Sequence, residues 1–197
     1  GQVVGLKQRT NYPWDGRIEL TVEDAGEFSL FLRIPGWCET GAALAINGQP
    51  FAGALTPGSY VEVRRAWRAD DRLRLTLPMT PRAVESHPRV TNNAGRIALM
   101  YGPILYCLEA NDNLDVHLDG VVLRGDLYES SFFINMLGAV VALHGTATPL
   151  PPESDWDDRL YRTRSLQAAP ENIHITAIPY FAWGNREPGA MRVWLRV

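Results

Sequence analysis

Histidine and cysteine are the side chains through which this sequence could hold a metal ion, and it contains four histidines and two cysteines. His87, His117, His144 and His174 stand far apart, and none belongs to a His-x-x-His or Cys-x-x-Cys arrangement. A zinc site needs three or four converging ligands. The spacing therefore predicts no metal site in this chain and no cofactor bound to it.

Cys38 and Cys107 are also the candidate thiol nucleophiles. An activated thiolate needs a cationic neighbour or a helix N-terminus, and no helix is predicted near Cys38, which follows Pro-Gly-Trp. We predict two buried, free thiols, with a Cys38–Cys107 disulfide as the alternative. Serine offers no better nucleophile, because there is no Gly-x-Ser-x-Gly elbow and Ser130-Ser131 shows no triad spacing to the histidines.

Carboxylates could act in pairs, as glycoside hydrolysis requires at a separation of roughly 5–10 Å. The densest acidic run contains Glu153, Asp155, Asp157 and Asp158, directly after a proline-rich stretch. Prolines and acids together favour a solvated surface loop, and the run lacks the spacing of a calcium-binding EF-hand loop. We therefore predict no catalytic residue in this chain.

Aromatic side chains are the remaining group with a binding chemistry, and many of them lie in predicted turns or at strand ends. Such rings can stack on sugars, or they can pack against a neighbouring domain, where aromatic residues and arginine are enriched. The packing interpretation is favoured here. If the chain binds an oligosaccharide, the candidate residues are Trp14, Trp37 and Trp183.

These residues are positioned by short strands. Phe28 to Ile34 alternates apolar residues on one face and ends at Pro35-Gly36, as expected of a central strand. Arg17 to Glu23 alternates in the same way, and the intervening turn predicts an antiparallel hairpin of the two. Further short strands follow with turn signals every ~8–12 residues, which is typical of a β-sandwich or jelly roll.

The predicted fold is all-β, with two antiparallel, jelly-roll-like β-sandwich domains, because no amphipathic helix of ten residues appears. The polar segment Ala110-Asn111-Asp112-Asn113 is interpreted as the boundary, which gives domains 1–110 and 111–197. An alternative within this scheme returns the last strand, Met191 to Val197, to the first domain.

Net charge and hydropathy exclude several partners. A net charge of −3 gives no broad attraction to nucleic acid or to an anionic membrane, and no run approaches the ~20 apolar residues of a membrane span. The composition, 46% hydrophobic and 21% charged, is that of a soluble globular protein. We expect a bacterial source, since almost all the positive charge is arginine. The chain begins at Gly1 without a signal peptide, which we interpret as the middle of a longer polypeptide, so its compartment stays unknown.

Seven local patterns occur in order along nearly the whole chain, and together they resemble the region after the catalytic barrel in family 127 glycoside hydrolases, the β-L-arabinofuranosidases. The patterns are Tyr12-Pro13-Trp14-Asp15-Gly16, Leu32-Arg33-Ile34-Pro35-Gly36-Trp37-Cys38, Ile46-Asn47-Gly48, Gly95-Arg96-Ile97-Ala98-Leu99, Gly102-Pro103-Ile104-Leu105-Tyr106-Cys107-Leu108-Glu109, Ile178-Pro179-Tyr180-Phe181-Ala182-Trp183-Gly184-Asn185-Arg186 and Met191-Arg192-Val193-Trp194.

The resemblance implies a parent enzyme with an (α/α)6 barrel followed by two β-sandwich domains, of which this chain is the sandwich part. It also implies zinc chemistry in the barrel, where a zinc-bound cysteine is the nucleophile. No position here matches that zinc motif, so Cys38 and Cys107 do not inherit the role. The expected function is non-catalytic support of the missing N-terminal barrel, with a carbohydrate-binding module or a homodimer contact as alternatives.

Overall fold

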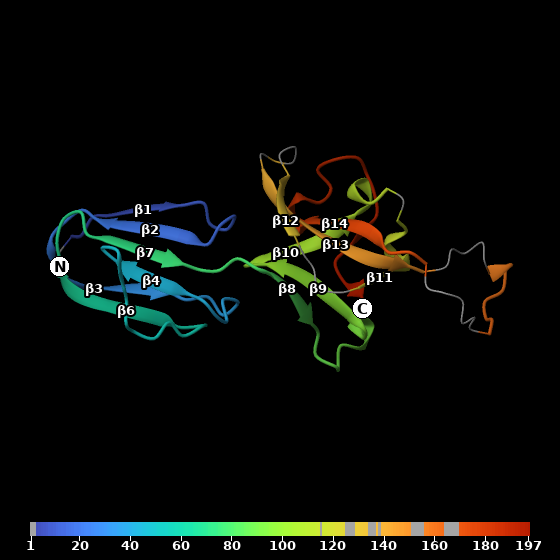
Figure 1. The fold of residues 1–197 in the computed structure, drawn as a ribbon, viewed down its shortest axis with the longest axis horizontal. Helices are drawn as coiled ribbons and strands as arrows, with labels where there is room; N and C mark the ends of the chain where they lie inside the picture. Colours follow the sequence, from blue (N-terminus) through green and yellow to red (C-terminus); the bar gives the residue numbers. More distant parts are fainter. Residues whose placement is uncertain are drawn as a thin grey trace. The chain divides into compact units, whose positions relative to one another are not determined.

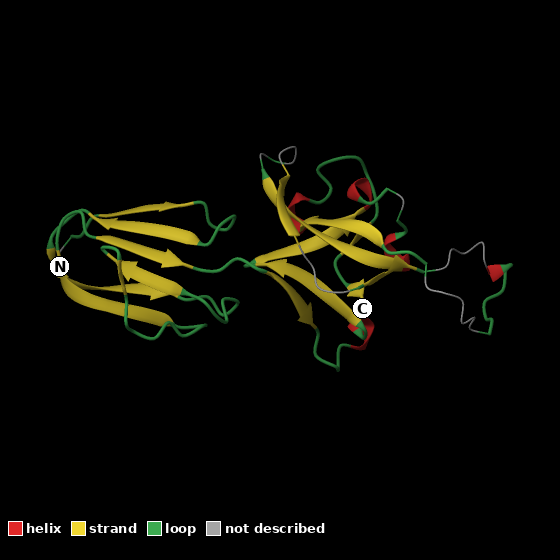
Figure 2. Ribbon diagram, in the orientation of Figure 1, coloured by secondary structure: helices red, strands yellow, loops and turns green. Residues whose placement is uncertain are grey.

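The computed structural model describes residues 3–114, 116–124, 129–133, 137, 139–150, 156–163 and 170–197. It divides into two compact units, Gly1–Thr80 and Pro81–Val197. The ordered elements are strands and three-residue 3-10 turns (Figure 2), so the prediction of an all-β chain is confirmed. None of the described helical segments has the length and apolar character needed to cross a membrane.

Unit 1 consists of two antiparallel sheets that share one apolar core. A five-stranded sheet has the order β1-β2-β7-β4-β5, and β3 pairs with β6 in a second layer (Figure 1). The strands are β1 (Leu6–Thr10), β2 (Arg17–Val22), β3 (Gly26–Arg33), β4 (Ala43–Ile46), β5 (Gln49–Pro50), β6 (Tyr60–Trp67) and β7 (Arg72–Thr76).

The predicted hairpin between residues 17–23 and 28–34 is wrong. β2 pairs with β1 and β7, whereas β3 pairs with β6, so the chain crosses from one sheet to the other at residues 23–25. The alternation that suggested a hairpin is explained by the shared core, because Val22 of one sheet and Leu30 of the other point into the same apolar cluster. Period-two alternation identifies the inward face of a strand but not its partner.

Unit 2 is built around a closed ring of six strands. Hydrogen-bonded neighbours run β10-β14-β13-β11-β16-β9, and β9 pairs again with β10 to close the ring. Three further strands flank it, since β8 pairs with β9, β12 with β13 and β15 with β10. The strands are β8 (Pro81–Glu85), β9 (Arg96–Tyr101), β10 (Ile104–Glu109), β11 (Val121–Leu123), β12 (Glu129–Phe133), β13 (Val140–Pro149), β14 (Ile173–Pro179), β15 (Met191–Arg192) and β16 (Leu195–Arg196).

This ring departs from the predicted second sandwich, and the division of the chain departs from the predicted boundary at residue 110. β8, β9 and β10 belong to unit 2, because β10 pairs with β14 and β9 pairs with the last strand. Leu195 therefore does pair with a strand from the predicted first domain, Ile97 in β9, but both lie in unit 2.

Candidate functional site

The three tryptophans proposed for sugar binding belong to two different units. Trp14 and Trp37 belong to unit 1, where both are half-buried and Trp37 packs against the core cluster. Trp183 belongs to unit 2 and is 40% exposed. Trp183 stacks on the exposed ring of Tyr180, so the candidate site is built around this residue.

We call Tyr180, Phe181 and Trp183 the aromatic corner. It begins where β14 ends at Pro179, continues through the 3-10 turn η5 (Tyr180–Ala182) and ends at Gly184, whose φ of +75° favours glycine. The rings of Tyr180 and Trp183 stack with centroids 6.1 Å apart and planes inclined by 22°. Tyr180 and Phe181 are 42% and 51% exposed, so the corner presents aromatic surface to solvent.

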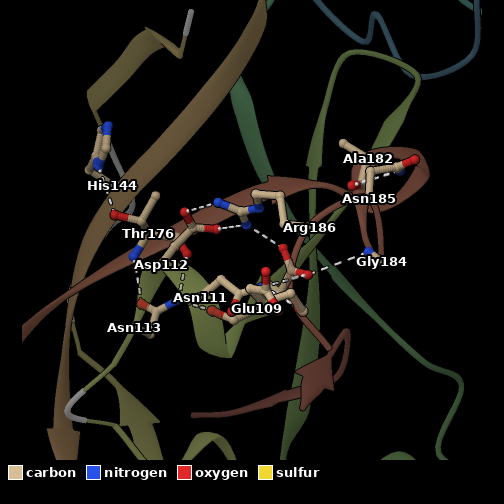
Figure 3. A network of polar contacts seen from close by, with 11 residues as sticks. Glu109, Asn111, Asp112, Asn113, His144, Thr176, Ala182, Gly184, Asn185 and Arg186 are labelled. Atoms are coloured by element: carbon tan, nitrogen blue, oxygen red, sulfur yellow. Dashed lines mark hydrogen bonds and ion pairs between the residues drawn. The ribbon is translucent and has the colours of Figure 1, made fainter. Parts of the chain in front are cut away.

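Next to the segment that carries Ala182 and Gly184 lies a buried ion triad of Glu109, Asp112 and Arg186 (Figure 3). Arg186 Nη1 donates to Asp112 Oδ1 at 2.7 Å and Nη2 donates to Asp112 Oδ2 at 2.5 Å, a bidentate pair. Arg186 Nη2 also donates to Glu109 Oε2. The carboxylate side chains are only 1% and 6% exposed, so one arginine is the shared counter-ion of two buried carboxylates.

Strand pairing brings these distant residues together. Glu109 is the last residue of β10, which pairs with β14 on one side and with β15 on the other. η2 (Ala110–Asp112) follows directly and carries Asp112. The Gly184 N–H donates to Glu109 Oε1 at 3.4 Å, which connects the end of the aromatic corner to the triad.

Asn113 attaches the same segment to β14. Its Nδ2 donates to the carbonyls of Glu109 at 2.8 Å and of Thr176 at 3.0 Å, and the Thr176 N–H donates to its Oδ1 at 2.9 Å. Asn113 is 4% exposed. The polar run 110–113, which suggested a domain boundary, is therefore an interior hydrogen-bonding segment of unit 2.

Electrostatics argue against a thiol nucleophile in this chain. Burial, followed by the nearby Glu109 and Asp112 charges, raises the pKa of Cys107 to about 12 despite the opposing effect of Arg186. Burial also raises the pKa of Cys38. Both cysteines are buried and free, which confirms the prediction of two free thiols and rules out the disulfide alternative.

The described residues do not fit the zinc site that the resemblance implies for the barrel. Among them, no group of three or more His, Cys, Asp or Glu side chains could hold a metal ion. Asp157 of the acidic run pairs with Arg159 at 3.3 Å, and both side chains are largely exposed. Glu153 and Asp155 lie outside the described residues.

One serine–histidine contact was not foreseen from the sequence. Ser131 Oγ lies 2.6 Å from His144 Nε2, and His144 Nδ1 lies 3.2 Å from Thr176 Oγ1. A hydrolytic triad has a carboxylate in the position that Thr176 occupies, where it stabilises the imidazolium. A threonine hydroxyl carries no charge for that purpose, so the three residues form a polar link between β12, β13 and β14.

The Glu109–Arg186 contact could not be found from the sequence, because the two residues are 77 positions apart and meet only through strand pairing. The ion triad also does not resemble an acid–base pair, since Arg186 engages both carboxylates. What the arrangement can do is fix an exposed aromatic surface on a rigid, charged base. This chemistry is that of a binding contact.

Comparison with known proteins defines the class. Residues 1–79 match the model of the GH127 middle domain, named beta-L-arabinofuranosidase, and residues 81–196 match that of the glycoside hydrolase family 127 C-terminal domain. The chain is thus an all-β pair of domains of the kind that a glycoside hydrolase family contains. It belongs to glycoside hydrolase family 127.

Individual relatives agree. The chain is 35% identical over 200 residues to a non-reducing end beta-L-arabinofuranosidase of Bifidobacterium longum subsp. longum, covering 97% of this chain and 30% of that protein. It is 42% identical, with a TM-score of 0.87, to the crystal structure of a GH127 beta-L-arabinofuranosidase from Geobacillus stearothermophilus T6, covering 98% of this chain and 30% of that one. A solved glycoside hydrolase gives 36% identity and a TM-score of 0.88, covering 98% of this chain and 32% of that one. The chain thus spans about 30% of the length of these relatives.

Proposed function

We propose that this chain is the non-catalytic C-terminal region of a bacterial glycoside hydrolase similar to β-L-arabinofuranosidases, and that it supports a catalytic (α/α)6 barrel elsewhere in that enzyme. The aromatic corner is a contact for that barrel or for a second subunit. Two observations support this proposal. The chain spans about 30% of the length of its relatives, and both of its thiols are buried.

The observation that carries the proposal is the exposure of stacked rings beside a buried ion triad. The exposed parts of these aromatic side chains, 40–51% of each, contribute no hydrophobic stabilisation while they face water. At a protein contact the same rings bury large apolar areas at low entropic cost. The buried ion triad holds the turn in place before any partner binds. Such preorganisation is typical of a contact surface.

Alanine substitution in the full-length enzyme tests the contact. Tyr180→Ala combined with Trp183→Ala should lower its melting temperature by more than it lowers that of the isolated 197-residue chain. Tyr161→Ala is the matched control, because Tyr161 is 90% exposed and lies outside the corner. Equal effects of the corner and control variants on the full-length enzyme would count against the proposal.

Activity of the isolated chain tests the non-catalytic role. We expect no turnover of an aryl arabinofuranoside by the purified chain, because Cys107 and Cys38 are protonated and Arg186 engages both buried carboxylates. Turnover at the rate of a full-length enzyme would defeat the proposal. Light scattering on the same sample would detect a subunit contact.

Sugar binding by Trp14, Trp37 and Trp183 is the weaker alternative. A binding module needs exposed rings aligned on one face, whereas Trp14 and Trp37 are half-buried and Trp37 packs against the core of unit 1. Titration with arabinan-derived oligosaccharides, followed by tryptophan fluorescence, should give a flat response. A saturable change would favour the binding module.

A further inference from the structure

The second sheet of unit 1 is much narrower than the first. Two strands, β3 and β6, lie opposite a sheet of five. In the described part of the chain, β3 pairs with β6 alone, through eight residue pairs from Gly26↔Trp67 to Arg33↔Tyr60. One edge of β3 is therefore open along its whole length.

The core of unit 1 is also less completely covered at some residues of β2 and β3 than at β6 and β7. Inward-facing residues of β6 and β7 are fully buried, with Val63 at 4% and Leu73 at 1% exposure. Their counterparts on β2 and β3, Leu20 and Leu30, are only half-buried although they pack against the same cluster. At the far end of the wide sheet, every residue of β1 is exposed.

The open edge of β3 presents a regular row of backbone groups. The Ile34 N–H donates to the Ser59 carbonyl at 2.9 Å, so Ile34 faces the β6 side. Hydrogen bonding alternates along an antiparallel strand, which directs the backbone groups of Arg33, Phe31 and Ser29 away from β6. An unpaired row of this kind is a template for another strand.

We propose that the open edge of β3 receives a β-strand from the part of the same polypeptide that lies outside these 197 residues. This inference rests on the proposed function, in which the chain belongs to a longer enzyme. The family members matched above carry about 70% of their length outside the aligned region, and a strand from the same polypeptide competes at high effective concentration.

The geometry also defines the chemistry of the incoming strand. Side chains on its inner face must be apolar, because they would cover Leu20, Phe28 and Leu30. On its outer face it meets Phe31, which is 60% exposed, between Glu27 and Arg33. Alternating apolar and polar residues with an aromatic or aliphatic neighbour for Phe31 fit this edge.

Amide hydrogen exchange, resolved by residue, tests the proposal in the isolated chain and in the full-length enzyme. The amides of Ser29, Phe31 and Arg33 should exchange at least about 100-fold more slowly in the full-length enzyme, because the added strand accepts their hydrogen bonds. The amides of Leu30 and Leu32, which face β6, should be protected in both and serve as the internal reference. Equal exchange of the edge amides in the two proteins would overturn the proposal.

Proline at the edge provides a second test that does not depend on exchange. Ser29→Pro removes an edge N–H, so it should lower the melting temperature of the full-length enzyme by about 3 °C or more relative to Ser29→Ala. In the isolated chain the two variants should differ by less than about 1 °C. Ser29→Ala is the matched control, because both variants lose the 2.6 Å hydrogen bond from Ser29 Oγ to Glu62.

Two outcomes identify a different occupant or none. Protection of the β3 edge in the isolated chain, together with a dimer in light scattering, would assign the edge to a second copy and overturn the proposal. An equal loss from Ser29→Pro in both proteins would mean that no strand is added. Both readouts are independent of the Tyr180 and Trp183 variants, so failure here is distinguishable from failure of the proposed function.

Discussion

At the scale of single residues, Glu109 and Asp112 place two carboxylates beside one arginine in the interior of unit 2. Both carboxylates are almost completely buried, and Arg186 is the cation that engages each of them. The hydrogen bond to Asp112 has the largest effect on the pKa of Arg186 and raises it. Burial lowers this pKa, and the hydrogen bond to Glu109 raises it, with a net increase. Arg186 therefore stays charged throughout the accessible pH range. Removing this arginine leaves two charges without their counter-ion.

We therefore predict that Arg186→Ala lowers the free energy of unfolding by about 3–5 kcal/mol. Arg192→Ala is the matched control, because Arg192 also pairs with an aspartate, Asp119, but both side chains are 42–46% exposed. Exposed pairs contribute roughly 0–1 kcal/mol. Urea denaturation of the two variants measures the difference, and similar losses would show that the triad is energetically a surface pair.

Cys107 gives a prediction about pH. Its pKa of about 12 lies above the ordinary value near 8.5, so the native thiol is uncharged at pH 8 and should resist iodoacetamide. The unfolded chain loses this proton first. The contribution to stability is therefore fully present below about pH 8.5 and is lost as the pH rises toward 12.

Alkylation at pH 8, followed by mass spectrometry, checks this prediction. Cys107 should be modified in urea and remain unmodified in the native chain over the same time. Rapid native modification would mean that the thiol is ionised or accessible, contrary to its complete burial.

At the scale of elements, Gly16 holds the start of β2 close to the end of β7. The Leu77 N–H donates to the Gly16 carbonyl at 2.8 Å. A Cβ on Gly16 would stand 1.7 Å from the Leu77 carbonyl oxygen, which is backbone and cannot move aside. Only glycine allows the two strands to approach this closely.

Gly16→Ala should consequently destabilise unit 1 by more than about 3 kcal/mol, or prevent its folding. Gly36→Ala is the control, because the nearest atom to its added Cβ, the Gly58 Cα, is 3.9 Å away. Circular dichroism during heating compares the two. A Gly16→Ala variant as stable as Gly36→Ala would show that the strands can separate at no cost.

The strands themselves were largely predictable, and their partners were not. Residues 17–22 and 28–33 alternate so regularly that their strand character and inward faces follow directly. Nothing in that alternation distinguishes a hairpin from a crossing between sheets, which is what residues 23–25 form. The ion triad could not be predicted for the same reason, since Glu109 and Arg186 meet only after β10, β14 and β15 have paired.

At the scale of the whole molecule, ring closure in unit 2 could not be read locally either. β9 pairs with three strands, β8, β10 and β16. Closure of the ring requires Leu195 to pair with Ile97, although the two residues lie near opposite ends of the sequence of unit 2. The polar run 110–113 was misleading, because its groups are satisfied in the interior by Thr176 and Arg186. The family was predicted correctly, because the resemblance depended on the order of short sequence patterns and not on which strands pair.

The proposal that the catalytic chemistry lies outside this chain can be tested by measuring zinc content. The family resemblance assigns zinc to the barrel, and the described residues of this chain offer no cluster of three ligands. The isolated chain, purified and dialysed without chelator, should contain far less than one zinc ion per molecule, whereas the full-length enzyme should retain about one. Metal analysis of both proteins decides the matter, and Cys38→Ala and Cys107→Ala should leave the zinc content of the full-length enzyme unchanged. Stoichiometric zinc in the isolated chain that is lost on either substitution would move part of the chemistry into these domains.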